Sequence, residues 1–269
     1  MAASAMGQSS SNREDRLKTI NREVYGEKGS FNQSTPWLAL ESNPEVLNSF
    51  AHKVGLENSY EFIDVLSPEL IEDHSKVKAL VLLFPCTETI YKFRSQEERA
   101  IRSGDLEQYL KRSEHIFFLE QISAFGNACG TIATLHVLSN LDAVKPGSAI
   151  RNFKEKTKSL KPSEIGKVLV NEPTLKASSD GAAQSDEAQT TCPARNGPDL
   201  DHHFAAFLSD NRGQLWELDG TKIGPIFHKA TSPETFLNDA MNVVRQNFMQ
   251  LEPELIEFSL CALVQKDEN

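Results

Sequence analysis

The sequence predicts a mixed α/β fold, with strands and helices interspersed and no strict strand–helix–strand rhythm. Residues 79–84 are apolar at every position, which is typical of a strand covered on both faces. Residues 128–140 contain no Asp, Glu, Lys or Arg and have the pattern of a helix buried on most sides. Residues 201–208 and 214–220 flank a five-residue turn that contains glycine, as in a hairpin. We therefore expect a sheet with helices packed against it.

The start of the chain differs in composition from the rest. Residues 1–35 are polar and charged, and we expect them to form a disordered tail. The chain of 269 residues has the length of one large domain or two small ones. We expect one domain, over residues 36–269.

The other elements have start and stop signals of their own. Asn43 and Pro44 predict a capped helix start, and Gly55 predicts the end of that helix. A capping pattern at residues 95–98 predicts the start of a charged surface helix. The remaining expected elements are strands over residues 61–66 and 258–264 and helices over residues 148–160 and 232–249.

One long stretch shows no such pattern. Residues 171–198 are mostly small or polar, with Leu175 as the only large aliphatic residue. Ordered loops of this length are uncommon and often act as lids or binding loops. An insertion without a role is the alternative, but the stretch lies between two candidate catalytic segments, which favours a lid.

The charge balance limits the partners. Lys and Arg number 28 against 38 Asp and Glu, giving a formal charge of −10 and a pI near 5.3. This sign is wrong for a nucleic-acid binder and suits a basic or neutral protein partner. The longest apolar run, residues 79–85, is too short to span a bilayer, and residues 1–12 lack the core of a secretion signal. We expect a cytoplasmic protein, with the nucleus as an alternative, that binds neither nucleic acid nor membrane.

The cysteines indicate a thiol site and no metal. Cys86, Cys129, Cys192 and Cys261 are far apart and form no Cys-x-x-Cys pair of the kind that suggests zinc or a redox couple, so we expect free thiols. Cys129 lies in a small-residue turn, 126–130, at the start of the predicted buried helix. The free N–H groups and positive end of a helix favour a thiolate there and can hold an oxyanion. A buried structural cysteine is the alternative.

The predicted hairpin brings a histidine to a carboxylate. If Leu208 pairs with Gln214, His203 lies directly opposite Asp219, with Cβ atoms about 5 Å apart. His202 then points to the other face, and the register depends on the turn length. A metal site at the two histidines is the alternative, although their spacing is not that of usual zinc ligands.

Cys129, His203 and Asp219 thus supply a nucleophile, a base and an orienting carboxylate, the arrangement of a thiol hydrolase. At these residues the chain resembles the ubiquitin C-terminal hydrolase family, in its short form without a C-terminal extension. Four blocks in family order carry the resemblance: residues 37–46, 127–132 (Asn-Ala-Cys-Gly-Thr-Ile), 203–204 (His-Phe) and 217–220 (Glu-Leu-Asp-Gly).

The resemblance implies Cys129 as the nucleophile, His203 as general base and acid, and Asp219 as the residue that orients His203. It also implies an upstream glutamine as oxyanion donor. Family members usually place it six residues before the cysteine, whereas Gln121 is eight before it and Ser123 occupies the sixth position. A two-residue insertion, at Ala124-Phe125 or nearby, explains the difference and leaves Gln121 in the role, with Ser123 as the alternative.

The resemblance also implies a fold and a substrate. The implied fold is an α/β/α sandwich around a mainly antiparallel sheet, with a knotted backbone path. A crossover loop lies over the catalytic cleft in the family, and residues 171–198 correspond to it by position. The implied substrate has a basic tail, for which the candidate binding residues are Leu38, Leu40, Glu41 and Asp64.

The implied function is cysteine-dependent removal of small adducts or unfolded peptides from the C-terminal glycine of ubiquitin, or of a ubiquitin-like protein. The implied enzyme is a monomer without a cofactor. Two alternatives stay open. The insertion between Gln121 and Cys129 can misplace the oxyanion donor and leave a ubiquitin-binding module with impaired catalysis. The other is a thiol acyltransferase or amidase for small substrates, which the acidic charge and the first block disfavour.

Overall fold

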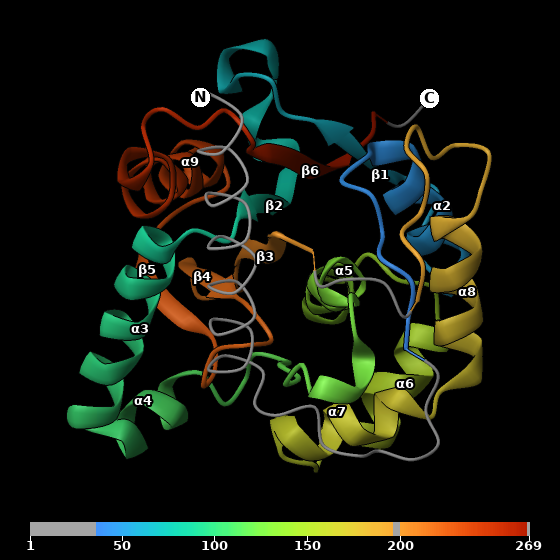
Figure 1. The fold of residues 1–269 in the computed structure, drawn as a ribbon, viewed down its shortest axis with the longest axis horizontal. Coiled ribbons are helices and arrows are strands. Elements are labelled where there is room, and N and C mark those ends of the chain that lie inside the picture. The colour runs from blue at the N-terminus through green and yellow to red at the C-terminus, as the bar shows by residue number, and fades with distance from the viewer. Residues whose placement is uncertain (1–35, 196–199, 268–269) are drawn as a thin grey trace, which may run out of the picture.

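The computed structural model describes residues 36–195 and 200–267 (Figure 1). The tail predicted for residues 1–35 lies outside the described residues. The strands are β1 (Tyr60–Asp64), β2 (Val77–Pro85), β3 (His202–Ser209), β4 (Gln214–Leu218), β5 (Ile226–Ala230) and β6 (Ser259–Gln265). The α-helices are α2 (Pro44–Val54), α3 (Glu88–Ser103), α4 (Leu106–Arg112), α5 (Cys129–Asn140), α6 (Ala149–Thr157), α7 (Pro162–Val170), α8 (Pro173–Ala183) and α9 (Phe236–Asn247). Short 3₁₀ turns cover Pro68–Leu70, His74–Lys76, Ser123–Phe125 and Met249–Leu251.

The six strands form one sheet in the order β1-β6-β2-β3-β4-β5, and each pair of neighbours is antiparallel. The strand nearest the C-terminus, β6, lies between β1 and β2. The apolar strand β2 lies between β6 and β3, so its predicted position inside the sheet is confirmed. Among the described helices, none is long and apolar enough to cross a membrane.

Helices cover both faces of the sheet. Ala79 and Val81 of β2 face a core that α2, α5, α6 and α8 share, whereas Leu80 and Leu82 face the core beneath α9. Figure 1 shows α9 on one side of the strands and α2, α5 and α8 on the other. Because side chains alternate along a strand, one apolar strand supplies both cores. The predicted α/β/α sandwich is therefore confirmed.

Local signals define the two helices nearest the site. The Asn43 side chain accepts a hydrogen bond from the Glu45 N–H (2.8 Å), and Gly55 ends α2 at φ 129°. These are the predicted caps. Helix α5 begins at Cys129 and is buried over eleven of its twelve residues, as its lack of charge predicts.

Three predictions about secondary-structure elements are wrong. Helix α3 does not begin near Ser95, because Thr87 caps it by accepting from the Ile90 N–H (3.2 Å). The stretch 171–198 is not a loop throughout, since α8 occupies its first half and buries Leu175 against the core. Helix α9 begins at Phe236, after a turn over residues 232–235.

The predicted register of the hairpin is also wrong. Leu208 pairs with Trp216 and not with Gln214. The reason is Asp210, whose side chain accepts from the Gln214 N–H (2.8 Å) and closes a tighter turn with Gly213 at φ 68°. The shift is two residues, and because side chains alternate with period two, each one keeps its predicted face.

Leu80→Ala tests the core beneath α9. Leu80 is fully buried in β2, so truncation leaves a cavity and should lower the free energy of unfolding by about 2–5 kcal/mol. Leu70→Ala is the matched control, because Leu70 is 70 % exposed and its loss should change that free energy by less than about 0.5 kcal/mol. Denaturant unfolding of both variants provides the comparison. Equal effects would contradict the assignment of Leu80 to the core.

Candidate active site

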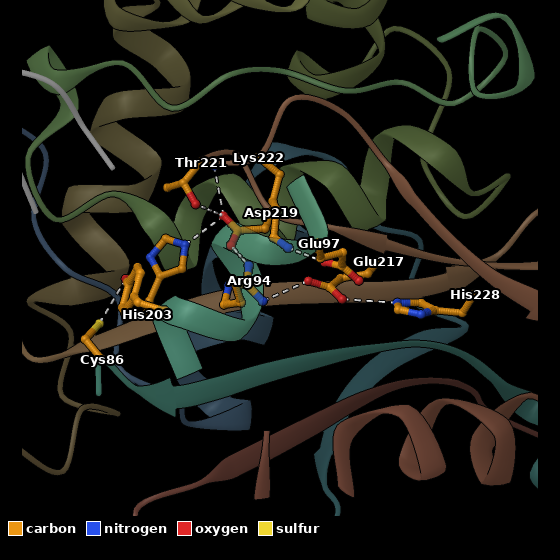
Figure 2. Close-up of polar contacts among 10 residues, drawn as sticks. Cys86, Arg94, Glu97, His203, Glu217, Asp219, Thr221, Lys222 and His228 are labelled. Carbon is orange, nitrogen blue, oxygen red and sulfur yellow. Dashed lines mark hydrogen bonds and ion pairs between the residues drawn. The ribbon is translucent and has the colours of Figure 1, made fainter. Parts of the chain in front are cut away.

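The hairpin brings His203 and Asp219 into contact. His203 Nε2 lies 2.7 Å from Asp219 Oδ1, and both side chains are almost completely buried. Asp219 directly follows β4, whereas His203 is the second residue of β3. The predicted contact is therefore present, although it crosses the strands diagonally and not between directly paired residues. The same Asp219 oxygen accepts from the Thr221 N–H (2.9 Å) and Oγ1 (2.8 Å), which fix its position (Figure 2).

Helix α5 brings Cys129 to the same place. Its second residue, Gly130, packs so closely on β3 that an added Cβ would lie 3.1 Å from the ring of Phe204. This approach places Cys129 within hydrogen-bonding contact of His203. Nε2 of His203 is committed to Asp219, so the other ring nitrogen, Nδ1, remains for the Cys129 thiol. The structure thus brings together all three predicted side chains.

The charges favour an imidazolium at His203. Burial alone would lower the pKa of His203, but the negative charge of Asp219, the hydrogen bond to it and the contact with Cys129 raise that pKa to about 9. Burial would likewise raise the pKa of Asp219, yet the charges of His203 and Arg94 and the Thr221 hydrogen bond hold it well below its usual range. Asp219 therefore stays ionised and holds a protonated histidine beside the thiol.

Charged side chains that were not predicted from the sequence contact Asp219 on the side away from His203. Arg94 of α3 donates to Asp219 Oδ2 and, through NH1, to Glu217 Oε1 (2.9 Å). His228 Nε2 lies 3.1 Å from the second Glu217 oxygen, Oε2 (Figure 2). Arg94, Glu217 and Asp219 are all buried. Arg94 is more than a hundred residues from both carboxylates, so no local pattern could have predicted these contacts.

Cys129 opens into a cleft of about 200 Å³. Residues 39–42 form one part of its wall, and residues from the end of α8 to Pro193, together with residues 200–202, form another. The lining includes Cys192 and His202. The segment that follows α8 thus covers one side of the cleft.

Of the predicted substrate-binding residues, some line the cleft and others do not. Leu40 and Glu41 line the cleft, and Glu41 Oε2 accepts from the Gln189 N–H (2.8 Å) of the covering segment. Leu38 is buried, and its N–H donates to Asp180 Oδ1 (2.9 Å). Asp64 lies at the exposed end of β1 and is not among the described residues that line the cleft. Leu40 and Glu41 therefore share the lining of the cleft with Cys129.

Gln121 is buried beside the hairpin. Its N–H donates to the Gly220 carbonyl (2.8 Å), and a Cβ on Gly220 would lie 3.0 Å from the Gln121 Cβ. Its side-chain oxygen has no hydrogen-bond partner among the described residues. Gln121 thus packs against Gly220, the residue that follows Asp219. It is not among the described residues that line the cleft. The side chain of Ser123 lies outside the described residues.

The inserted residues are anchored in the core. Phe125 is fully buried, with its ring centroid 5.6 Å from that of Trp37 in an edge-to-face contact. The Trp37 N–H donates to the Phe125 carbonyl (2.9 Å), and Gly126 turns the chain at φ 65° toward Cys129. The insertion is therefore packed outside the cleft, against the first block, and does not separate Cys129 from His203.

The other acidic, thiol and imidazole groups do not gather into a metal site. Within residues 36–195 and 200–267, no group of three or more His, Cys, Asp and Glu side chains could hold a metal ion. His202 Nδ1 pairs instead with Asp201 Oδ1 at 3.0 Å. Burial lowers the pKa of His136 to about 4, and this histidine stacks on Phe118 in the core.

A thiol at a helix start, against an imidazole that a carboxylate orients, defines the site as that of a cysteine hydrolase. Comparison with known proteins identifies the particular family. Residues 37–250 match the model for "Ubiquitin carboxyl-terminal hydrolase, family 1". The chain belongs to this family.

Relatives match over nearly their whole length. A ubiquitin carboxyl-terminal hydrolase of Drosophila melanogaster is 39 % identical over 84 % of this chain and 96 % of its own. Human ubiquitin carboxyl-terminal hydrolase isozyme L1 is 30 % identical over 83 % of this chain and 96 % of its own. The catalytic domain of Trichinella spiralis UCH37, solved with ubiquitin vinyl methyl ester, matches with a TM-score of 0.68. It is 18 % identical and covers 89 % of this chain and all of that chain. That structural match confirms the fold.

Asp219→Asn tests the electrostatics of the site. Without the carboxylate charge, burial acts almost unopposed, so the pKa of His203 should fall from about 9 to below its ordinary value of 6.5. Imidazole NMR signals followed over pH give the titration midpoint.

Asp64→Asn is the control, because it removes an exposed carboxylate elsewhere on the sheet and should leave the midpoint unchanged. The pKa of His203 is higher in the folded chain than in the unfolded one, so protonation of His203 contributes its full stabilisation below about pH 6.5. This contribution is lost as pH rises through about 9. A midpoint near 9 in Asp219→Asn would refute the assigned cause.

Proposed function

We propose that this chain is a thiol-dependent hydrolase that cleaves small adducts or unfolded peptides from the C-terminal glycine of ubiquitin. The observation that carries the proposal is the contact of Cys129 with the buried His203–Asp219 pair at the cleft. Membership of the family supplies the substrate, because its relatives are ubiquitin carboxyl-terminal hydrolases. No step of the reaction needs a cofactor.

The reaction proceeds in two halves. The Cys129 thiolate attacks the carbonyl carbon of the terminal glycine, and His203 gives its proton to the leaving group as the bond to the adduct breaks. The product is a thioacyl enzyme. His203, now neutral, takes a proton from a water molecule that attacks the thioester. Ubiquitin leaves with a free carboxylate, and the Cys129–His203 pair is restored.

The oxyanion of each tetrahedral intermediate needs hydrogen-bond donors. Helix α5 has no side-chain cap at Ala128, so the N–H groups of its first turn are available beside Cys129. We assign the second donor to the Nε2 amide group of Gln121, whose backbone N–H is tied to the Gly220 carbonyl. The buried anchor at Phe125 supports this assignment, because the insertion is taken up outside the cleft.

The segment over the cleft favours small or unfolded leaving groups. Arg195 NH2 pairs with Asp180 Oδ2 (2.9 Å), and Arg195 NH1 donates to the Pro36 carbonyl (2.8 Å). These contacts tie the segment that follows α8 to the start of the first block. A leaving group must then pass beside a chain that is fixed near both ends. Glu41, at the cleft, is our candidate for a basic residue of the ubiquitin tail.

Two further expectations stay predictions. A monomeric state and a cytoplasmic location, with the nucleus as an alternative, agree with the acidic composition and with reduced cysteines. Size-exclusion chromatography with light scattering and imaging of the tagged chain would test them.

Hydrolysis of ubiquitin that carries a fluorogenic amide at its C-terminus tests the function. The parent chain should release the fluorophore, and Cys129→Ala should abolish release because no other nucleophile takes its place. Cys192→Ala is the matched control, since Cys192 lines the same cleft and should not carry the reaction. Binding of ubiquitin without turnover by the parent would instead indicate the binding module.

Gln121→Leu tests the oxyanion donor. Loss of one such donor should lower kcat by about 10²–10³-fold with little change in KM, because the hydrogen bond forms mainly in the transition state. Ser123→Ala is the comparison and should retain nearly full kcat. The reverse result, a large loss in Ser123→Ala alone, would transfer the role to Ser123.

A further inference from the structure

A row of titratable and charged side chains, most of them buried, extends from the candidate site to the edge strand β5. It runs from His203 through Asp219, Arg94 and Glu217 to His228 on β5 (Figure 2). Each member contacts the next through a side-chain hydrogen bond or ion pair. Such a buried row is costly unless every charge is compensated.

The two oxygens of Asp219 have different partners. Oδ1 takes His203 and Thr221, whereas Oδ2 takes Arg94. Arg94 therefore fixes the carboxylate from behind and prevents it from turning away from the imidazole. Arg94 Nη1 donates to Glu217 Oε1 (2.9 Å), and the guanidinium carbon lies 5.0 Å from the centre of the Phe84 ring. The guanidinium has little freedom to move.

The charges of Arg94, Glu217 and Asp219 alone do not cancel. Arg94 compensates one of the two buried carboxylates, Asp219 and Glu217, and leaves one negative charge. Nearby Lys222 pairs with Glu97 and adds no net charge. An imidazolium at His203 supplies the missing positive charge. We propose that Arg94 and Glu217 are positioning residues: Arg94 holds Asp219 in place, and Glu217 neutralises the charge of Arg94, so that the charge of Asp219 acts on His203.

Four of the titratable groups around this row have settled charge states. Burial raises the pKa of Cys86 to about 12 and that of Tyr91 well above its usual range. Burial also raises the pKa of Tyr109 and lowers that of His136 to about 4. These four groups stay neutral through the range in which His203 titrates. The groups facing the row from each neighbouring element are Cys86 after β2, Tyr91 and Glu97 of α3, Tyr109 of α4, Cys129 and His136 of α5, Lys222 after β4 and His228 of β5.

This inference rests on the proposed function for its meaning, because a protonated His203 is the acid of the first half-reaction. It makes a prediction that needs no substrate. Glu217 pairs with Arg94 and His228, so a change of its charge reaches the imidazole through Arg94, Asp219 and the field between them. A merely structural role for Glu217 would lower stability and leave the titration of His203 where it is.

Glu217→Gln tests the proposal, because it removes the charge and keeps the shape. The NMR titration midpoint of His203 in the free protein should move down by about one pH unit, as for a nearby charge at an effective dielectric constant near 20. The high-pH limb of kcat/KM for the fluorogenic ubiquitin amide should move by the same amount. An unchanged midpoint in a folded Glu217→Gln protein would overturn the proposal.

Two further variants complete the experiment. Asp239→Asn removes a carboxylate of α9 that pairs with Lys229 on β5, and should leave the midpoint unchanged. The double variant Arg94→Met with Glu217→Met loses one charge of each sign, and apolar replacement of a buried pair is often tolerated. Its midpoint should stay near that of the parent. If Glu217→Gln does not fold, a shift of one unit or more in this double variant would overturn the proposal.

The NMR arm separates this inference from the proposed function. A chain that fails to cleave the ubiquitin amide but shows the shifted midpoint refutes the function and retains the positioning role. If the parent chain cleaves the amide and Glu217→Gln leaves the midpoint unshifted, the function is retained and the positioning role is refuted.

Discussion

The contact between His203 Nε2 and Asp219 Oδ1 is the interaction on which the site depends. It is buried on both sides, so the charge of the carboxylate is poorly screened and acts on the imidazole more strongly than it would in water. Without it, a buried histidine would be neutral and free to rotate. With it, one ring nitrogen is fixed, and the other is left for Cys129. The sheet, the hairpin and α5 can be understood as the scaffold that maintains this contact.

The part of the fold that follows from local patterns could be predicted. Caps at Asn43 and Gly55, the uncharged run of α5 and the apolar run of β2 each depend on neighbours in the chain, and each prediction is confirmed. The hairpin register was wrong by two residues because Asp210 tightens the turn through its own side chain. The contact of His203 with Asp219 survived this error because an even shift preserves the faces of a strand.

Long-range contacts could not be predicted. The start of α3 depends on Thr87, and the capping pattern at Ser95 lies inside the helix, where it has no capping role. Arg94 was missed for a similar reason, since its partners are on the hairpin and no spacing in the sequence links them. The cover of the cleft was only partly anticipated, because small residues in 171–198 allow α8 to pack closely and still resemble a loop.

The most direct test of the central claim is to map where the chain reacts with ubiquitin that carries an electrophile in place of its terminal carboxylate. Mass spectrometry of the digested adduct should find ubiquitin on the peptide of Cys129, and His203→Gln should lose this adduct while it remains folded. Attachment to Cys192, the other thiol of the cleft, or full labelling of Cys129 without His203, would contradict the convergence of thiol, imidazole and carboxylate at one site.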